Sequence, residues 1–173
     1  MSVTLLDVRL RFAADDQRMV GRIAVAGRDV VFQYNEAFLA SGLSLSPIHL
    51  PPRPGVQAFK PAAGMDLFGL FEDALPDSWG RRVIDRHFQR TLMRTPTILE
   101  RLAFVGERAM GALTFHPPEE SEETRSEELH LAKLAEQAWD FDSEKIEDAL
   151  PELRRVAGTS GGARPKALLG LPT

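Results

Sequence analysis

The sequence predicts an α+β protein: a small antiparallel sheet, or a partly closed barrel, packed with helices and followed by a short helical segment and a glycine-rich loop or strand. Three observations predict this fold. Apolar and polar residues alternate in the first 34 residues, which is the period of half-buried strands. Residues 79–92 carry apolar side chains at helical spacing. Residues 158–166 are rich in glycine.

The composition excludes several classes of protein. Of the 173 residues, 43% are hydrophobic and 27% are charged, which is an ordinary globular balance and not that of a disordered or fibrous chain. There is no cysteine, which excludes disulfides and thiolate metal ligands and favours the cytoplasm. No apolar run approaches the roughly 20 residues that span a bilayer. The net charge of −4 argues against direct DNA binding.

Three strands are expected near the N-terminus, over residues 8–12, 20–25 and 30–34. In the first, Val8, Leu10 and Phe12 alternate with Arg9 and Arg11. The turns between the strands are too short for a parallel crossover, so the strands should form an antiparallel meander. Residues 43–54 contain four prolines and should be extended and irregular.

Helices are expected in the middle of the chain. Asp66 can cap a helix over residues 67–75 that Pro76 ends or kinks. A second helix should bury one face, whose apolar residues are Trp79, Val83, Ile84, Phe88 and Leu92. Arginines fall four apart on another face of this helix, at Arg82, Arg86, Arg90 and Arg94. They form either a solvated face or a surface for phosphates, for an acidic partner or for the acidic segment of this same chain, and the solvated face is the usual case.

A capping box and an acidic run mark the next boundaries. Thr97 and Glu100 have the capping-box spacing, and the helix that they open should end near Gly106. Residues 112–115 are apolar enough to return as a strand. The acidic run that follows is expected to be an exposed linker over residues 118–127. It separates a domain of residues 1–117 from residues 128–173, where two further helices precede the glycine-rich segment.

Candidate chemistry is concentrated near the end of the chain. In residues 158–166, glycines, hydroxyl groups and two cations could form a nest that holds phosphate, although a flexible turn has the same pattern. Asp73 and Asp77 could form an acid/base pair, but helix capping and pairing with arginines is the favoured interpretation. The four histidines lack metal-ligand spacing, so we expect no metal site.

Three segments give the chain a resemblance to a known family. They are FGLFEDALPDSWGRRVIDR at residues 68–86, RLAFVGERAMGALTFHP at 101–117 and GTSGGARPKALL at 158–169. In order and spacing, the chain resembles the HipA-like serine/threonine kinases, the toxins of bacterial toxin–antitoxin pairs. The resemblance implies that residues 1–117 are the N-terminal subdomain and that residues 128–173 begin the kinase core.

The resemblance also implies roles for the glycine-rich loop. In the family this loop closes over the phosphates of ATP, and a hydroxyl residue in it is autophosphorylated. The matching phosphate-binding positions here are Ser160, Gly161, Gly162, Ala163, Arg164 and Lys166. The position of the family's usual serine is occupied by Thr159, and Ser160 follows it, so both are candidate sites of autophosphorylation.

Two functions follow from the resemblance. In the first, the chain is the front part of a truncated kinase that phosphorylates a translation-related protein, with an antitoxin as a further partner. The family's catalytic and magnesium-binding aspartates lie further along, so these residues should hold no catalytic group, and ATP and Mg²⁺ should bind only to the full-length kinase. In the second, the chain is a stand-alone module that docks an antitoxin or a separate kinase chain. Both functions place it in the cytoplasm, without a membrane partner.

Overall fold

The computed structural model describes residues 3–13, 15–60, 66–109 and 111–117. The chain divides into two compact units, one of residues 1–75 and 97–119 and the other of residues 76–96 and 120–173. Within the described residues, the first unit contains every strand and three helices, and the second contains one helix. No helix in the described ranges has the length and apolar character that crossing a membrane requires.

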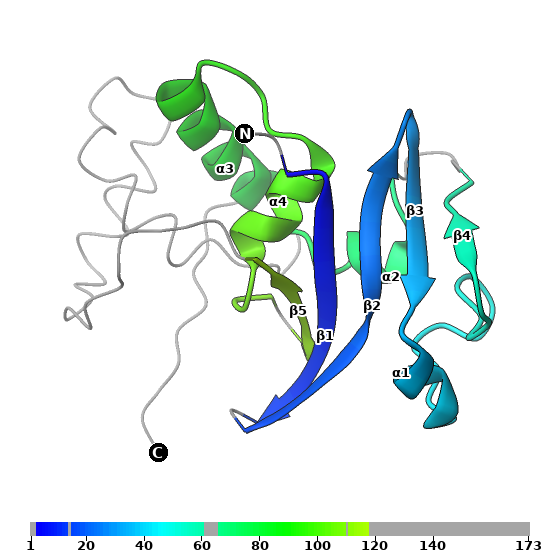
Figure 1. Ribbon diagram of the computed structural model, residues 1–173. Coiled ribbons are helices and arrows are strands. Elements are labelled where there is room, and N and C mark those ends of the chain that lie inside the picture. The colour runs from blue at the N-terminus through cyan, green and yellow to red at the C-terminus, as the bar shows by residue number, and fades with distance from the viewer. Residues whose placement is uncertain (1–2, 14, 61–65, 110, 118–173) are drawn as a thin grey trace. The chain divides into compact units, whose positions relative to one another are not determined.

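The first unit is built on an open, five-stranded antiparallel sheet (Figure 1). The first three strands form the expected meander, and β5 adds to the free edge of β1 to give the order β4-β3-β2-β1-β5. The α+β prediction is therefore confirmed, with an open sheet in place of a barrel. The strands are β1 (Leu5–Ala13), β2 (Asp16–Ala26), β3 (Asp29–Tyr34), β4 (Val56–Ala58) and β5 (Leu113–His116).

The alternation of β1 places one set of side chains in the core. Leu6, Val8 and Leu10 are buried, whereas Arg9 and Arg11 lie on the opposite face. Phe12 was expected to continue the buried set, but it is 68% exposed. A register shift between Arg11 and Ala13 interrupts the pairing there, and the hairpin end extends beyond the core. The prediction for Phe12 was therefore wrong.

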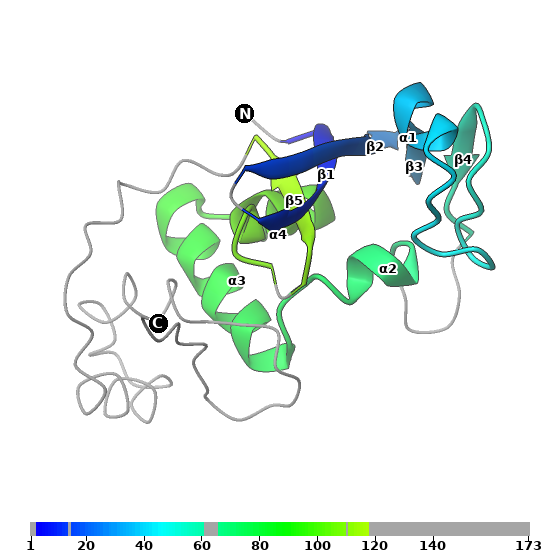
Figure 2. The ribbon, with the colours of Figure 1, turned by 90° about the horizontal axis from the view of Figure 1, so that it is seen from below.

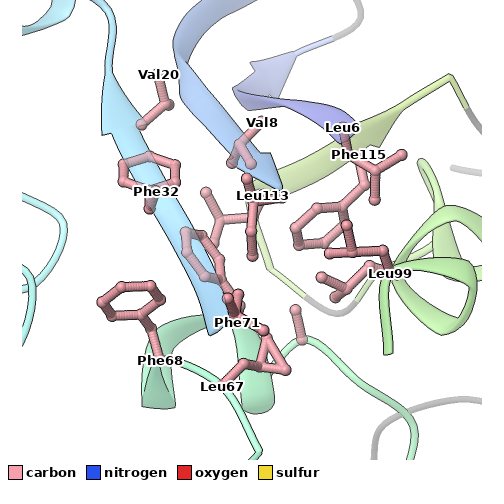
Figure 3. Packing of buried hydrophobic residues seen from close by; sticks show 14 of the residues in the cluster. Leu6, Val8, Val20, Phe32, Leu67, Phe68, Phe71, Leu99, Leu113 and Phe115 are labelled. Atoms are coloured by element: carbon pink, nitrogen blue, oxygen red, sulfur yellow. The ribbon is translucent and has the colours of Figure 1, made fainter. Parts of the chain in front are cut away.

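Helices α2 (Gly69–Glu72) and α4 (Ile98–Val105) cover the same face of the sheet (Figure 2). The ring of Phe71 from α2 lies 5.2 Å from that of Phe32 on β3 and 6.2 Å from that of Phe115 on β5. Leu99 of α4 packs into the same cluster (Figure 3). Buried aromatic rings contribute both area and edge-to-face attraction, so Phe71 links strands that lie far apart in the sheet.

The expected helix over residues 67–75 is much shorter. Helix α2 starts after Phe68, which makes no side-chain cap, and Asp73 follows its last residue. Asp66 is exposed and does not cap the helix, and the helix ends well before Pro76. Burial of Phe71 stabilises this single turn, and the capping and termination predicted from the sequence were wrong.

Helix α4 matches its prediction closely. The hydroxyl of Thr97 accepts a hydrogen bond from the Glu100 amide at 3.3 Å, and the Glu100 carboxylate accepts one from the Thr97 amide at 2.7 Å. This is the reciprocal capping box. Gly106 ends the helix with a φ of 52°, a conformation that favours glycine.

Two elements were not predicted. Asn35 caps the short helix α1 (Glu36–Ala40) by accepting hydrogen bonds from the amides of Ala37 and Phe38. Strand β4 has only three residues and follows the proline-rich stretch. That stretch, residues 43–54, contains no helix or strand, as expected.

The second unit contains α3 (Ser78–Leu92) within the described residues. Asp77 caps it by accepting a hydrogen bond from the Gly80 amide at 2.9 Å. The expected apolar face is buried as far as Phe88, but Leu92 is 50% exposed. Leu92 is the last residue of the helix, so it lies beyond the buried face, and Met93 then turns the chain with a φ of 53°.

Candidate functional site

The phosphate-binding residues predicted from the sequence lie outside the described residues, and their role stays a prediction. They are Thr159, Ser160, Gly161, Gly162, Ala163, Arg164 and Lys166. The predicted linker, residues 118–127, lies outside them too. Of the two aspartates considered as an acid/base pair, Asp77 caps α3 with its side chain, which confirms the capping interpretation for this residue, whereas Asp73 follows α2 and bonds to that helix through its backbone N–H.

The outer face of the sheet lies on the side opposite α2 and α4 (Figure 2), and the start of α1 borders it, because Asn35 and Glu36 line a hollow on this face. Its side chains form rows across the strands, because the register places residues directly opposite each other. One row is apolar and consists of Leu5, Ala24, Val31 and Ala58. The next row is mainly polar and consists of His116, Asp7, Arg22, Gln33 and Val56.

A β-bulge hollows this outer face. Val8 pairs with Gly21, but Arg9 pairs with Met19, so Val20 is an extra residue in β2. Val20 and Gly21 are both buried, which leaves β2 without an outward side chain at this point. The resulting hollow has a volume of about 560 Å³ and is lined by Asp7, Arg9, Gln17, Met19, Gly21, Arg22, Gln33, Tyr34, Asn35 and Glu36.

Only glycine fits the floor of this hollow. A Cβ atom on Gly21 would lie 2.3 Å from the carbonyl oxygen of Gln33 and 2.6 Å from Cζ of Phe32. Strands β2 and β3 are therefore closer here than a side chain allows. The Tyr34 hydroxyl, on the neighbouring strand, donates a 2.7 Å hydrogen bond to the Leu50 carbonyl, and burial raises the pKa of this tyrosine.

The two arginines that line the hollow differ in their ion pairing. Arg22 Nε lies 3.0 Å from the Asp7 carboxylate, so these two charges neutralise each other. Arg9 makes one long contact, 3.5 Å from its Nη1 to Oε1 of Gln17, and forms no ion pair with any described residue. Its side chain is nevertheless partly buried. The Arg9 guanidinium therefore retains most of its hydrogen-bonding capacity at the wall of the hollow.

A second polar cluster lies at the β5 edge of the same face. Arg11 donates hydrogen bonds to the Glu107 carboxylate at 2.7 Å and to the Glu107 carbonyl at 2.8 Å, which ties the segment after α4 to β1. The ring Nε2 of His116 lies 2.9 Å from the Thr114 hydroxyl and 3.9 Å from the Glu107 carboxylate. Burial, with the nearby Arg9 charge, lowers the pKa of His116.

This cluster has the residue types of a nucleophile, a base and an acid, but not their geometry. Thr114 is only 1% exposed, so its hydroxyl cannot reach a substrate. Both contacts of His116 use Nε2, whereas a catalytic base is oriented through its other nitrogen. Across the described ranges, no three His, Asp or Glu side chains are grouped to hold a metal ion.

The structure defines a small α+β domain with a polar hollow on the outer face of its sheet. The family model of the HipA N-terminal domain matches residues 13–116, from the end of β1 to the end of β5. The match covers more than half of the chain, and the chain belongs to this family. No curated protein and no solved structure matches it. The resemblance inferred from the sequence is confirmed for this region, and the match ends before the glycine-rich segment.

The sequence did not single out the lining of the hollow. Arg9 appeared only as a polar position of a strand, and Gln17 and Gln33 carried no recognisable signal. The signal that could have located the site is Gly21, a glycine inside a strand pattern, which often marks a bulge or a close backbone approach.

Proposed function

We propose that this chain is the N-terminal part of a HipA-like serine/threonine protein kinase, the toxin of a toxin–antitoxin system, which phosphorylates a translation-related protein in the cytoplasm. The observation that supports the proposal is the family match over residues 13–116, followed in the sequence by GTSGGARPKALL at 158–169. The glycines, hydroxyls and cations of that segment have the chemistry of a loop that binds ATP phosphates.

Phosphoryl transfer tests the proposal. The protein encoded by the complete reading frame should transfer labelled phosphate from ATP, in the presence of Mg²⁺, to itself and to a translation factor or aminoacyl-tRNA synthetase. The 173-residue chain alone should transfer none, because it lacks segments that resemble the family's catalytic and magnesium-binding motifs. Absence of transfer by the complete protein, or transfer by the chain alone, would contradict the proposal.

The role of the loop is tested separately by calorimetric ATP titration of the complete protein. Gly162→Val should weaken ATP binding at least tenfold, because a side chain would occupy the space where the backbone meets the phosphates. Gly162→Ala should have a smaller effect in the same direction. An unchanged ATP affinity in both variants would show that the segment is only a connector.

A second candidate function is a docking module for an antitoxin or for a separate kinase chain. The hollow of the outer face favours it, because a hollow lined by polar side chains can receive part of a partner protein. The chain would be co-expressed with the products of the neighbouring genes, and any co-purifying pair would be titrated by calorimetry. A micromolar or tighter complex that Gln33→Glu weakens would support docking through this face. Binding that Gln33→Glu leaves unchanged would contradict it.

A further inference from the structure

We propose that the hollow on the outer face of the sheet binds a carboxylate side chain of a partner protein, presented within a short segment that also carries apolar residues. This proposal rests on the docking function above and is independent of the kinase activity. It identifies Arg9 as the residue that receives the carboxylate.

Arg9 differs from the other arginines of this face. On this face Arg11 pairs with Glu107 and Arg22 with Asp7, whereas Arg18, which lies opposite the inward-facing Leu10, pairs with Asp16. Among the residues that the structure describes, Arg9 has only its long contact with Gln17, although it is partly buried. A partly buried charge without a counter-ion is costly, and a carboxylate can satisfy a guanidinium with two parallel hydrogen bonds. Arg9 is thus the cation of this face with the most to gain from an external carboxylate.

The hollow provides the space and the polar partners for such a segment. Gln17 and Gln33 are exposed and line it, and their amides can bind either the second carboxylate oxygen or the segment's backbone. At the bulge, Val20 and Gly21 are both buried, so no side chain of β2 fills the floor of the hollow. The site is therefore walled by side chains that bind a peptide and floored by strand backbone.

The surroundings restrict the kind of segment. The apolar row begins two residues along the strands from the row that contains Asp7 and Arg22, which is about 7 Å. Leu5 is 48% exposed in that row, so the segment should place an apolar side chain there. Glu36 is exposed and also lines the hollow, and it would repel a second acidic residue. A single carboxylate next to apolar residues fits better than an acidic run.

The charge balance of the face argues against a nucleic acid. Three arginines of this face, Arg9, Arg11 and Arg22, stand against three carboxylates, because Glu36 lies beside Asp7 and Glu107, which are already paired. Binding to a phosphate backbone depends on an excess of cations that can replace counter-ions, and this face has no such excess. The single guanidinium without an ion pair among the described residues of this face, that of Arg9, instead fits a single carboxylate of the partner segment.

The test uses the whole 173-residue chain and two capped heptapeptides. One has a single central glutamate between leucines, and the other has glutamine in its place. In NMR titrations, the Arg9 side-chain Nε–H signal should shift saturably with the glutamate peptide, and the glutamine peptide should bind at least tenfold more weakly. Arg9→Gln should remove this preference, whereas the control Arg18→Gln should leave the affinity within twofold, because Arg18 does not line the hollow.

A further variant keeps the test decisive if Arg9→Gln affects folding. Gln33→Glu changes an exposed residue of the hollow, leaves Arg9 in place and should also weaken the glutamate peptide at least tenfold. Equal affinity for the two peptides, shifts centred on Arg18, no saturable shift up to about 5 mM peptide, or stronger binding of a single-stranded oligonucleotide would each overturn the proposal. None of these outcomes bears on phosphoryl transfer by the complete protein.

Discussion

Replacement of Gly21 by alanine should destabilise the sheet by about 2 kcal/mol. The added Cβ would lie 2.3 Å from the Gln33 carbonyl oxygen, and ordinary contact begins at 3.4 Å, so strand β3 must retreat by about 1 Å. Overpacking of this kind costs about 1–3 kcal/mol. The upper end of this range applies because the new Cβ meets the backbone carbonyl of Gln33, which cannot move aside as a flexible side chain can. Alanine also restricts the unfolded chain, which offsets roughly 0.5–1 kcal/mol.

Urea unfolding measures this effect. With a slope of about 2 kcal/mol per molar urea, the midpoint of Gly21→Ala should fall by about 1 M. Gly27→Ala is the matched control, because Gly27 has open space around its Cβ position and a φ of +66°. Its cost should come from conformation alone, about 1 kcal/mol. An unchanged or higher midpoint for Gly21→Ala would refute the close approach of β2 and β3.

Three further variants test other parts of the fold. Arg11→Met should lower the stability by about 1 kcal/mol at low salt and less at high salt, because the Glu107 pair is partly exposed; a salt-independent loss in urea unfolding would contradict this. The pKa of His116 in the folded protein lies below its ordinary value of 6.5, so on acidification the unfolded chain binds a proton before the folded protein does. The contribution of His116 to stability is therefore present at pH values above 6.5 and is lost as the pH falls below 6.5. His116→Gln should reduce that acid-side loss between about pH 7.5 and 5, and an identical pH profile would refute the assignment. Met93→Gly should stabilise the fold by about 0.5–1 kcal/mol and raise the thermal midpoint, because Met93 is 85% exposed and its backbone has a left-handed conformation that glycine adopts without strain. A lower midpoint would argue against this conformation at the C-terminal end of α3.

The sequence predicts the elements whose signals are local. Alternation in β1, β2 and β3 and the capping box of α4 each depend on neighbouring residues, and all four elements are present. The short elements α1 and β4 contain too few residues to show a period, although Asn35 before Glu36 is a helix-start signal. Asp66 failed as a cap because burial of Phe71, a tertiary effect, decides where α2 lies.

The candidate site depends on pairings that no single segment reveals. Arg11 and Glu107 are 96 positions apart, and β5 joins β1 only in the folded sheet. The hollow exists because the register shifts at one residue, which places Arg9 opposite Met19. Alternation predicts that Arg9 points away from the core, but the absence of an ion pair depends on residues from other strands.

The position of β5 in the sheet has a consequence during synthesis. Strand β1 is complete at residue 13, but its second neighbour is complete only at residue 116. At about 5–20 residues per second, a ribosome needs roughly 5–20 s to make the intervening chain. During that time, one edge of β1 has unpaired amides and carbonyls that another nascent chain can bind. Arg9 and Arg11 occupy alternate positions of β1, and their charges oppose pairing with another chain until β5 has been synthesised and has paired with β1.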